Sequence, residues 1–214
     1  MPATETPPQT SPPRPSLTRL DPPGIRAVVL LLHGGTQQSA EPVDGRSASW
    51  RRSLLMQRSI TPLAHEAGVA TWLLRYRHRG WNGGTGPIAD ARWALEEVRR
   101  ELGEVPVVLL GHSMGGRTAV HVADDPVVRG VVALAPWLPA GELVSALAGR
   151  TLRAAHGRRD RITSYGATAA YVERAGAVAR EATLVDMGRV GHYMLRSADA
   201  WNEVALGAAL DLLA

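Results

Sequence analysis

Apolar residues along this chain come in short blocks separated by longer mixed segments. From residue 26 onward, the apolar blocks are typical of strands buried on both faces, and the segments between them have helical character. The strands are expected at 27–32, 69–74, 107–110, 131–135, 151–155 and 182–186, and the helices at 53–67, 89–102, 117–123, 164–178 and 198–213. Strands of this length alternating with helices predict a doubly wound, three-layer α/β fold. Its sheet is mostly parallel, has about six strands, and carries helices on both faces.

The first 25 residues do not follow this pattern. They hold eight of the fifteen prolines of the chain. Because proline lacks a backbone N–H, we expect residues 1–25 to form a disordered or polyproline-like tail. Residues 26–214 are then a single α/β domain, without an internal repeat or a second block of distinct composition.

Composition narrows the classes of function. The chain is 45% hydrophobic and 21% charged, as is usual for a globular protein, and has no apolar run of membrane-spanning length and no signal-like start. A cytoplasmic protein is the expectation. The absence of cysteine excludes disulfides, thiol catalysis and thiolate metal sites. The net charge is +4, but the arginines are mostly interleaved with acids and no nucleic-acid-binding module is present, so we expect no nucleic-acid partner.

One motif stands out. The apolar run 105–110 leads directly into Gly111-x-Ser113-x-Gly115 and then into a helical segment. A sharp strand-to-helix turn forces its serine into a crowded backbone conformation, so the flanking glycines supply space. The turn exposes the Ser113 hydroxyl, and the start of the helix offers backbone N–H groups to a developing negative charge. The motif therefore predicts that Ser113 is a nucleophile.

A serine nucleophile needs a base, and catalytic groups of open α/β sheets lie at the C-terminal ends of strands. This rule selects His192, between the last predicted strand and the last helix. His33 and His156 also follow strands, and we interpret them as turn residues. His112, inside the motif, is expected to point away from Ser113. The other histidines are interpreted as surface or core residues: His65, His78 and His121.

The same rule selects the acid that orients the base. Asp160 follows the penultimate strand at its C-terminal end, whereas Asp186 and Glu142 are less well placed. The arginines beside Asp160 are either solvated or, if close, favour its ionised form. An oxyanion hole needs two backbone donors. We assign the Met114 N–H and, in the glycine turn after the first strand, the Gly35 N–H, with Thr36 as the less favoured alternative.

Together these motifs resemble the α/β-hydrolase superfamily, in which oxyanion turn, nucleophile, acid and base follow in this order. The resemblance covers residues 27–214. It implies a serine hydrolase that cleaves a small carboxylic ester or thioester through an acyl-enzyme, with Ser113, His192 and Asp160 in their named roles and without metal or other cofactor. The N-terminus looks reduced, since the family's first two strands have no counterpart before residue 26. Residues 138–150 are too few for a cap domain, so we expect an open, lidless site.

The substrate pocket and the exact activity are less constrained. Tentative substrate contacts are Trp137, Tyr193, Trp81 and Thr36, and a packing role is the alternative for each. The arginines between residues 46 and 79 suggest an anionic substrate or, as the favoured interpretation, a solvated basic face. A peptidase or acyltransferase on the same triad, or a non-catalytic binding protein of this fold, are the alternative functions.

Overall fold

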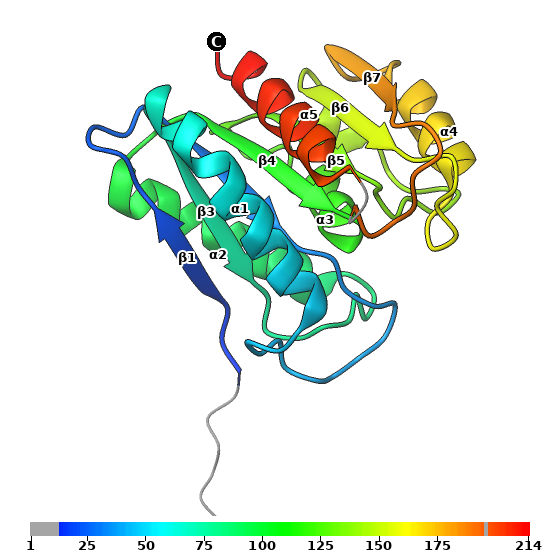
Figure 1. The fold of residues 1–214 in the computed structure, drawn as a ribbon, viewed down its shortest axis with the longest axis horizontal. Coiled ribbons are helices and arrows are strands. Elements are labelled where there is room, and N and C mark those ends of the chain that lie inside the picture. The colour runs from blue at the N-terminus through cyan, green and yellow to red at the C-terminus, as the bar shows by residue number, and fades with distance from the viewer. Residues whose placement is uncertain (1–12, 195–196) are drawn as a thin grey trace, which may run out of the picture.

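The computed structural model describes residues 13–194 and 197–214. Its centre is a seven-stranded sheet in the order β1-β3-β2-β4-β5-β6-β7 (Figure 1). The strands are β1 (Ser16–Leu20), β2 (Ala27–Leu32), β3 (Val69–Arg75), β4 (Val107–His112), β5 (Val128–Leu134), β6 (Thr151–His156) and β7 (Glu181–Asp186). Strands β2 to β7 are parallel and β1 is antiparallel to β3, which confirms the predicted mostly parallel sheet and adds one strand to it.

Helices cover both faces of the sheet. They are α1 (Ala48–Glu66), α2 (Thr85–Leu102), α3 (Met114–His121), α4 (Tyr165–Ala175) and α5 (Ala198–Asp211), with a short 3₁₀ helix η1 (Ser145–Leu147). Helices α1 and α5 pack on one face, and α2, α3 and α4 on the other (Figure 1). None of the described helices is both long and apolar enough to cross a membrane.

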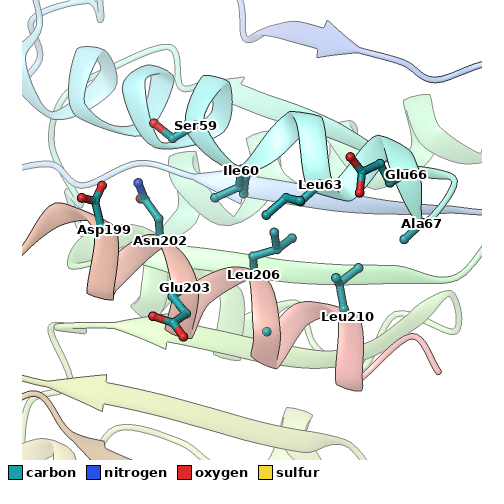
Figure 2. Close-up of a pocket in the computed structure, with 11 residues that line it drawn as sticks. Ser59, Ile60, Leu63, Glu66, Ala67, Asp199, Asn202, Glu203, Leu206 and Leu210 are labelled. Carbon is teal, nitrogen blue, oxygen red and sulfur yellow. The ribbon is translucent and has the colours of Figure 1, made fainter.

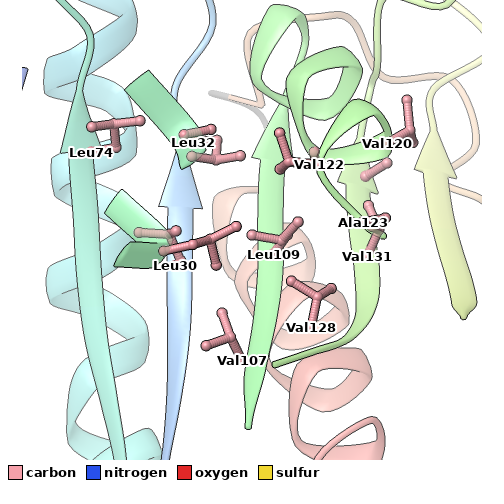
Figure 3. Close-up of a cluster of buried hydrophobic side chains, with 14 of the residues drawn as sticks. Leu30, Leu32, Leu74, Val107, Leu109, Val120, Val122, Ala123, Val128 and Val131 are labelled. Atoms are coloured by element: carbon pink, nitrogen blue, oxygen red, sulfur yellow. The ribbon is translucent and has the colours of Figure 1, made fainter. Parts of the chain in front are cut away.

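The central strands are buried on both faces because each contributes side chains to two cores. In β2, Leu30 and Leu32 point into the core under α2 and α3, and Leu31 points into the core under α1 and α5. Figure 3 shows the first of these cores, where Leu30, Leu109 and Val131 from three neighbouring strands lie side by side. A continuous apolar run is therefore what a central strand needs, and this is the pattern that the sequence shows.

Three helices begin earlier than predicted. Helix α1 begins at Ala48 rather than at residue 53, α2 begins at Thr85 rather than at residue 89, and α3 begins at Met114 rather than at residue 117. The first turn of α2 contains Gly86 and Pro87, which indicate a loop when read from sequence. Proline is nevertheless tolerated in a first turn, because its missing N–H would have no partner within the helix.

The expectation of a structureless tail is wrong for residues 16–20, which form β1. Proline flanks this strand at positions 15 and 22 rather than interrupting it, and an edge strand needs a partner on one side only. Helix α1 also holds β1 in place. The buried Gln57 side chain donates hydrogen bonds to the carbonyls of Thr18 (2.9 Å) and Thr71 (2.7 Å), which links α1 to β1 and β3. Residues 1–12 lie outside the described residues.

Replacement of Gln57 by methionine tests this link, because methionine keeps the length of the side chain and removes both hydrogen bonds. We expect Gln57→Met to lower the free energy of unfolding by about 1–3 kcal/mol. Hydrogen exchange should rise first at the amides of β1. Urea unfolding and hydrogen-exchange mass spectrometry measure these effects, with the exposed neighbour Arg58→Met as the control. Unchanged exchange in β1 would contradict the proposed anchoring role.

Candidate active site

Ser113 occupies a sharp turn between β4 and α3. Its φ of 54° and ψ of −116° lie outside the common regions for a residue with a side chain. Backbone hydrogen bonds to the exit of β5 hold this conformation. The Ser113 N–H donates to the Leu134 carbonyl (3.0 Å), and the Ser113 carbonyl accepts from the Trp137 N–H (3.1 Å). The turn is therefore imposed by the neighbouring strand.

The glycines of the motif are needed for close backbone approach. A Cβ atom at Gly111 would overlap the backbone of Gly115, and one at Gly115 would overlap the backbone of Leu32 at the end of β2. Helix α3 can therefore begin directly against β2 and β4, as the sequence motif predicts.

The structure brings together the three residues that the sequence selected as nucleophile, base and acid. His192 Nε2 lies 3.0 Å from Ser113 Oγ, and His192 Nδ1 lies 2.7 Å from Asp160 Oδ2. The carboxylate accepts from Nδ1–H, so Nε2 is left to accept the proton of the serine hydroxyl. Ser113 and His192 are each only 6% exposed. The arrangement has the hydrogen-bond geometry required for activation of a serine hydroxyl.

The Asp160 carboxylate is the most heavily hydrogen-bonded group of the site. Oδ2 accepts from His192, from the Thr163 hydroxyl (2.8 Å) and from His156 Nε2 (3.2 Å), while Oδ1 accepts from the N–H groups of Ile162 (2.8 Å) and Thr163 (2.9 Å). Burial by itself would raise the pKa of Asp160, but these hydrogen bonds outweigh it and hold the pKa well below its usual range. The hydrogen bonds, and not the flanking arginines, keep the group ionised.

Two of these partners were missed or misread in the sequence. His156 is more than a turn residue, since its Nδ1 lies 2.8 Å from Thr168 Oγ1 while its Nε2 faces Asp160. Its position at the end of β6 could have indicated a role in the site, because Asp160 was selected for following the same strand. Thr163 carries no signal of its own, because a threonine in a loop is common.

His112, which the sequence predicts to point away from Ser113, packs against His192 and lines the serine cavity. Its ring lies 4.9 Å from that of His192 between centroids, and its Nε2 is 3.1 Å from the His192 carbonyl oxygen. Burial, together with the nearby charges of His192 and Arg52, lowers the pKa of His112 to about 3. His112 is therefore neutral and donates to the loop that carries His192.

Two backbone N–H groups lie beside Ser113 as candidate oxyanion donors. Those of Met114 and Gly35 have no hydrogen-bond acceptor among the described residues. Thr36 does not fit this role, because its N–H donates to the Arg79 carbonyl (2.9 Å). A Cβ atom at Gly35 would overlap the Arg79 backbone carbonyl oxygen and the end of the Met114 side chain, so glycine is required at this position.

A cavity of about 120 Å³ opens beside the serine. Of the four tentative substrate residues only Tyr193 lines it, and Arg52 of α1 is an additional wall that the sequence did not single out. Its full lining comprises Gly34, Gly35, Ala48, Ser49, Arg52, His112, Ser113, Ile162, His192 and Tyr193.

The tryptophans take part in packing instead. The guanidinium carbon of Arg117 lies 4.3 Å from the ring centroid of Trp81 and 4.5 Å from that of Trp137. Arg117 also pairs with the buried Glu142. Both indole rings therefore pack in a cluster with Arg117, and neither is in the lining of the serine cavity.

Other candidate groups lie elsewhere. Asp186 pairs with Arg158, and Glu142 pairs with Arg117 and His121, so neither contacts His192. A larger cavity of about 800 Å³ is a groove between α1 and α5 that contains none of the predicted site residues (Figure 2). Within the described ranges, no three His, Asp or Glu side chains are grouped in a way that could hold a metal ion.

Comparison of the sequence with models of known protein families identifies the family of this chain. A model of the alpha/beta hydrolase family matches residues 29–210. The chain belongs to this family. The hydrolase has no match among curated protein sequences. As in the lidless members, no cap domain is inserted between β5 and β6, where only η1 lies in the fully described segment 135–150.

Solved structures show the same fold at low sequence identity. A serine hydrolase homologue from Coxiella burnetii is similar with a TM-score of 0.72 and 17% identity, and the match covers 92% of each chain. A lidless serine hydrolase from Xanthomonas campestris has a TM-score of 0.67 and 18% identity, covering 92% of this chain and 88% of that one. A Thermogutta terrifontis esterase solved with bound butyrate has a TM-score of 0.68 and 17% identity, and the match covers 93% of this chain and 88% of the esterase.

The turn that carries Gly35 depends on a neutral histidine, and this generates a pH prediction. His33 Nδ1–H donates to the Gly34 carbonyl (2.6 Å), and Nε2 accepts from the Tyr76 N–H (3.3 Å). Burial lowers the pKa of His33 from 6.5 to about 4. Between these values the unfolded chain binds the proton and the folded chain does not, so acid favours unfolding by up to about 1.4 kcal/mol per pH unit for this histidine.

We therefore expect the free energy of unfolding to fall between pH 6.5 and pH 4, and to fall less steeply in His33→Asn. Denaturant titrations at half-unit pH steps measure both slopes. His112 acts in the same direction in both proteins, so only the difference between slopes reports on His33. Parallel slopes would show that the folded state accepts a charged His33.

Proposed function

We propose that this hydrolase cleaves a carboxylic ester or thioester through an acyl-enzyme formed on Ser113. The observation that carries the proposal is the continuous hydrogen-bonded path from Ser113 Oγ through His192 to the buried Asp160 carboxylate. A non-catalytic protein of the same fold would have no reason to keep a strained serine, a histidine hydrogen-bonded to it, and a carboxylate with five hydrogen-bond donors together.

In the proposed first step, Ser113 Oγ attacks the carbonyl carbon of the substrate while its proton passes to His192 Nε2. Asp160 stabilises the imidazolium through the Nδ1–H hydrogen bond. The carbonyl oxygen becomes an oxyanion, which accepts hydrogen bonds from the N–H groups of Met114 and Gly35. When the tetrahedral intermediate collapses, His192 returns the proton to the leaving alcohol or thiol, and the acyl group remains on the serine.

The second step reverses these roles with water. His192 removes a proton from a water molecule, the hydroxide attacks the acyl carbon, and Ser113 leaves with the proton from His192, which releases the free acid. The small cavity and the open surface at Tyr193 and Ile162, 56% and 60% exposed, support a short acyl group and direct entry of water. The esterase from Thermogutta terrifontis, with its bound butyrate, supports the same substrate class.

The nucleophile is tested by Ser113→Ala with p-nitrophenyl esters of graded acyl length. We expect kcat to fall by about 10⁴-fold or more, because attack, proton transfer and acyl-enzyme formation all require Oγ. A fluorophosphonate probe should label the native chain and leave the variant unlabelled. Equal turnover in both proteins, together with no labelling of either, would refute the hydrolase mechanism.

The acid is tested by Asp160→Asn. The amide keeps the shape but favours the wrong imidazole tautomer and stabilises no imidazolium, so we expect kcat to fall by about 10⁴-fold. Steady-state kinetics on the same esters measure it. Asp186→Asn, a change of one exposed carboxylate paired with Arg158, is the matched control and should remain within a few-fold of the native rate. If Asp160→Asn behaved like this control, another group would have to orient His192.

A further inference from the structure

Arg52 stands between two cavities near the serine. It lines the cavity of about 120 Å³ that contains Ser113, and also an adjacent cavity of about 130 Å³ whose walls are mainly apolar. Tyr193 is the other residue common to both linings, and the Arg52 guanidinium carbon lies 5.0 Å from the centroid of its ring. The pair therefore forms the partition between the cavities, next to the reacting groups.

The charge on Arg52 has no counter-charge in the part of the chain that the structure describes. Its Nη1 is buried without a hydrogen-bond partner, and no carboxylate pairs with it. Nine other arginines do pair with carboxylates: Arg19, Arg77, Arg79, Arg92, Arg99, Arg100, Arg117, Arg153 and Arg158. Desolvation lowers the pKa of Arg52, and the contact with Tyr193 opposes this shift only in part.

The rest of the serine cavity adds no negative charge. Among the described residues, its lining includes no aspartate or glutamate. Ala48 and Ser49 bring the first turn of α1 to the cavity, this turn contains no acidic residue, and the Ser47 hydroxyl donates to Asp44 instead of capping the helix. Arg52 is therefore the only arginine, aspartate or glutamate in the described lining of this cavity, and an entering anion could pair with it.

We propose that Arg52 is a specificity-determining residue that binds a carboxylate on the substrate, so that the preferred substrates are short esters with a second, anionic carboxylate. This rests on the proposed function, which supplies the ester. Ser113 and Arg52 line the same cavity of only about 120 Å³, so the second carboxylate belongs close to the scissile carbonyl, as in half-esters of succinic or glutaric acid. A planar guanidinium suits a carboxylate because it offers two parallel N–H donors.

The test compares two esters with acyl chains of equal length, ethyl hydrogen glutarate and ethyl valerate. We expect the native enzyme to have a kcat/KM at least about tenfold higher for the half-ester, and Arg52→Gln to lose this preference mainly through KM. Arg52→Lys, which keeps the charge without the fork of donors, should recover part of it. Arg58→Gln removes an exposed charge on the same helix outside the cavity lining and should retain the preference.

A kcat/KM ratio near one between the two esters in the native enzyme, or an equal ratio in Arg52→Gln, would overturn the proposal, while ester turnover would still support the hydrolase mechanism.

Binding measurements test the site without turnover. Ethyl hydrogen glutarate, ethyl valerate and inorganic phosphate are titrated by NMR into Ser113→Ala and into Ser113→Ala with Arg52→Gln. Arg52-dependent binding of the half-ester supports the anion site even if native protein hydrolyses neither ester. Equal binding to both proteins, or stronger binding of phosphate than of the half-ester, overturns the carboxylate assignment.

Discussion

The contact on which the site depends is the close approach of the Ser113 turn to the neighbouring strands. Gly115 lies against the backbone of Leu32, and Ser113 exchanges backbone hydrogen bonds with the exit of β5. Because β4 pairs with β2 on one side and with β5 on the other, the turn at its end can lie only where these two strands also end. The exit of β2 then brings Gly35 to the serine, and the exits of β6 and β7 lead to Asp160 and His192. Residues far apart in sequence meet because parallel strands end on the same edge.

The buried Asp160 carboxylate of the site is stabilised by hydrogen bonds and not by ion pairs with arginine. Asp160 keeps its negative charge because side chains and backbone N–H groups point at it from several elements, and burial keeps His112 neutral. Two arginines pair elsewhere, Arg158 with Asp186 and Arg117 with Glu142. Arg52 is the exception in the serine cavity. An uncompensated cation costs stability, and such a cost is typical of a group held ready for a ligand.

Much of the fold could be predicted because a buried parallel strand has a simple signature. Continuous apolar runs such as 27–32 and 107–110 are where the structure has β2 and β4, and the Gly-x-Ser-x-Gly turn falls where the sequence indicates it. The sequence did not predict strand β1, because contacts with other elements stabilise it. Gln57 of α1 donates a hydrogen bond to β1, and β3 pairs with it along its edge. Neither contact can be inferred from the five residues of the strand itself. The starts of α1 and α2 were missed for a related reason, since tertiary packing supports first turns whose own sequence is typical of loops.

The sequence by itself determined which residues meet at the site, because a parallel sheet must bring their positions to one edge: Ser113 in its motif, Asp160 and His192 after late strands, and glycines where backbones touch. Only the tertiary structure decided which groups surround them. It placed His156 and Thr163 on the carboxylate, used the Thr36 N–H elsewhere, and moved Trp81 and Trp137 to Arg117. It also placed Arg52 in the serine cavity without a carboxylate partner among the described residues. Motifs depend on local backbone geometry, which neighbours in sequence impose, whereas a pocket wall depends on which side chains from distant elements meet.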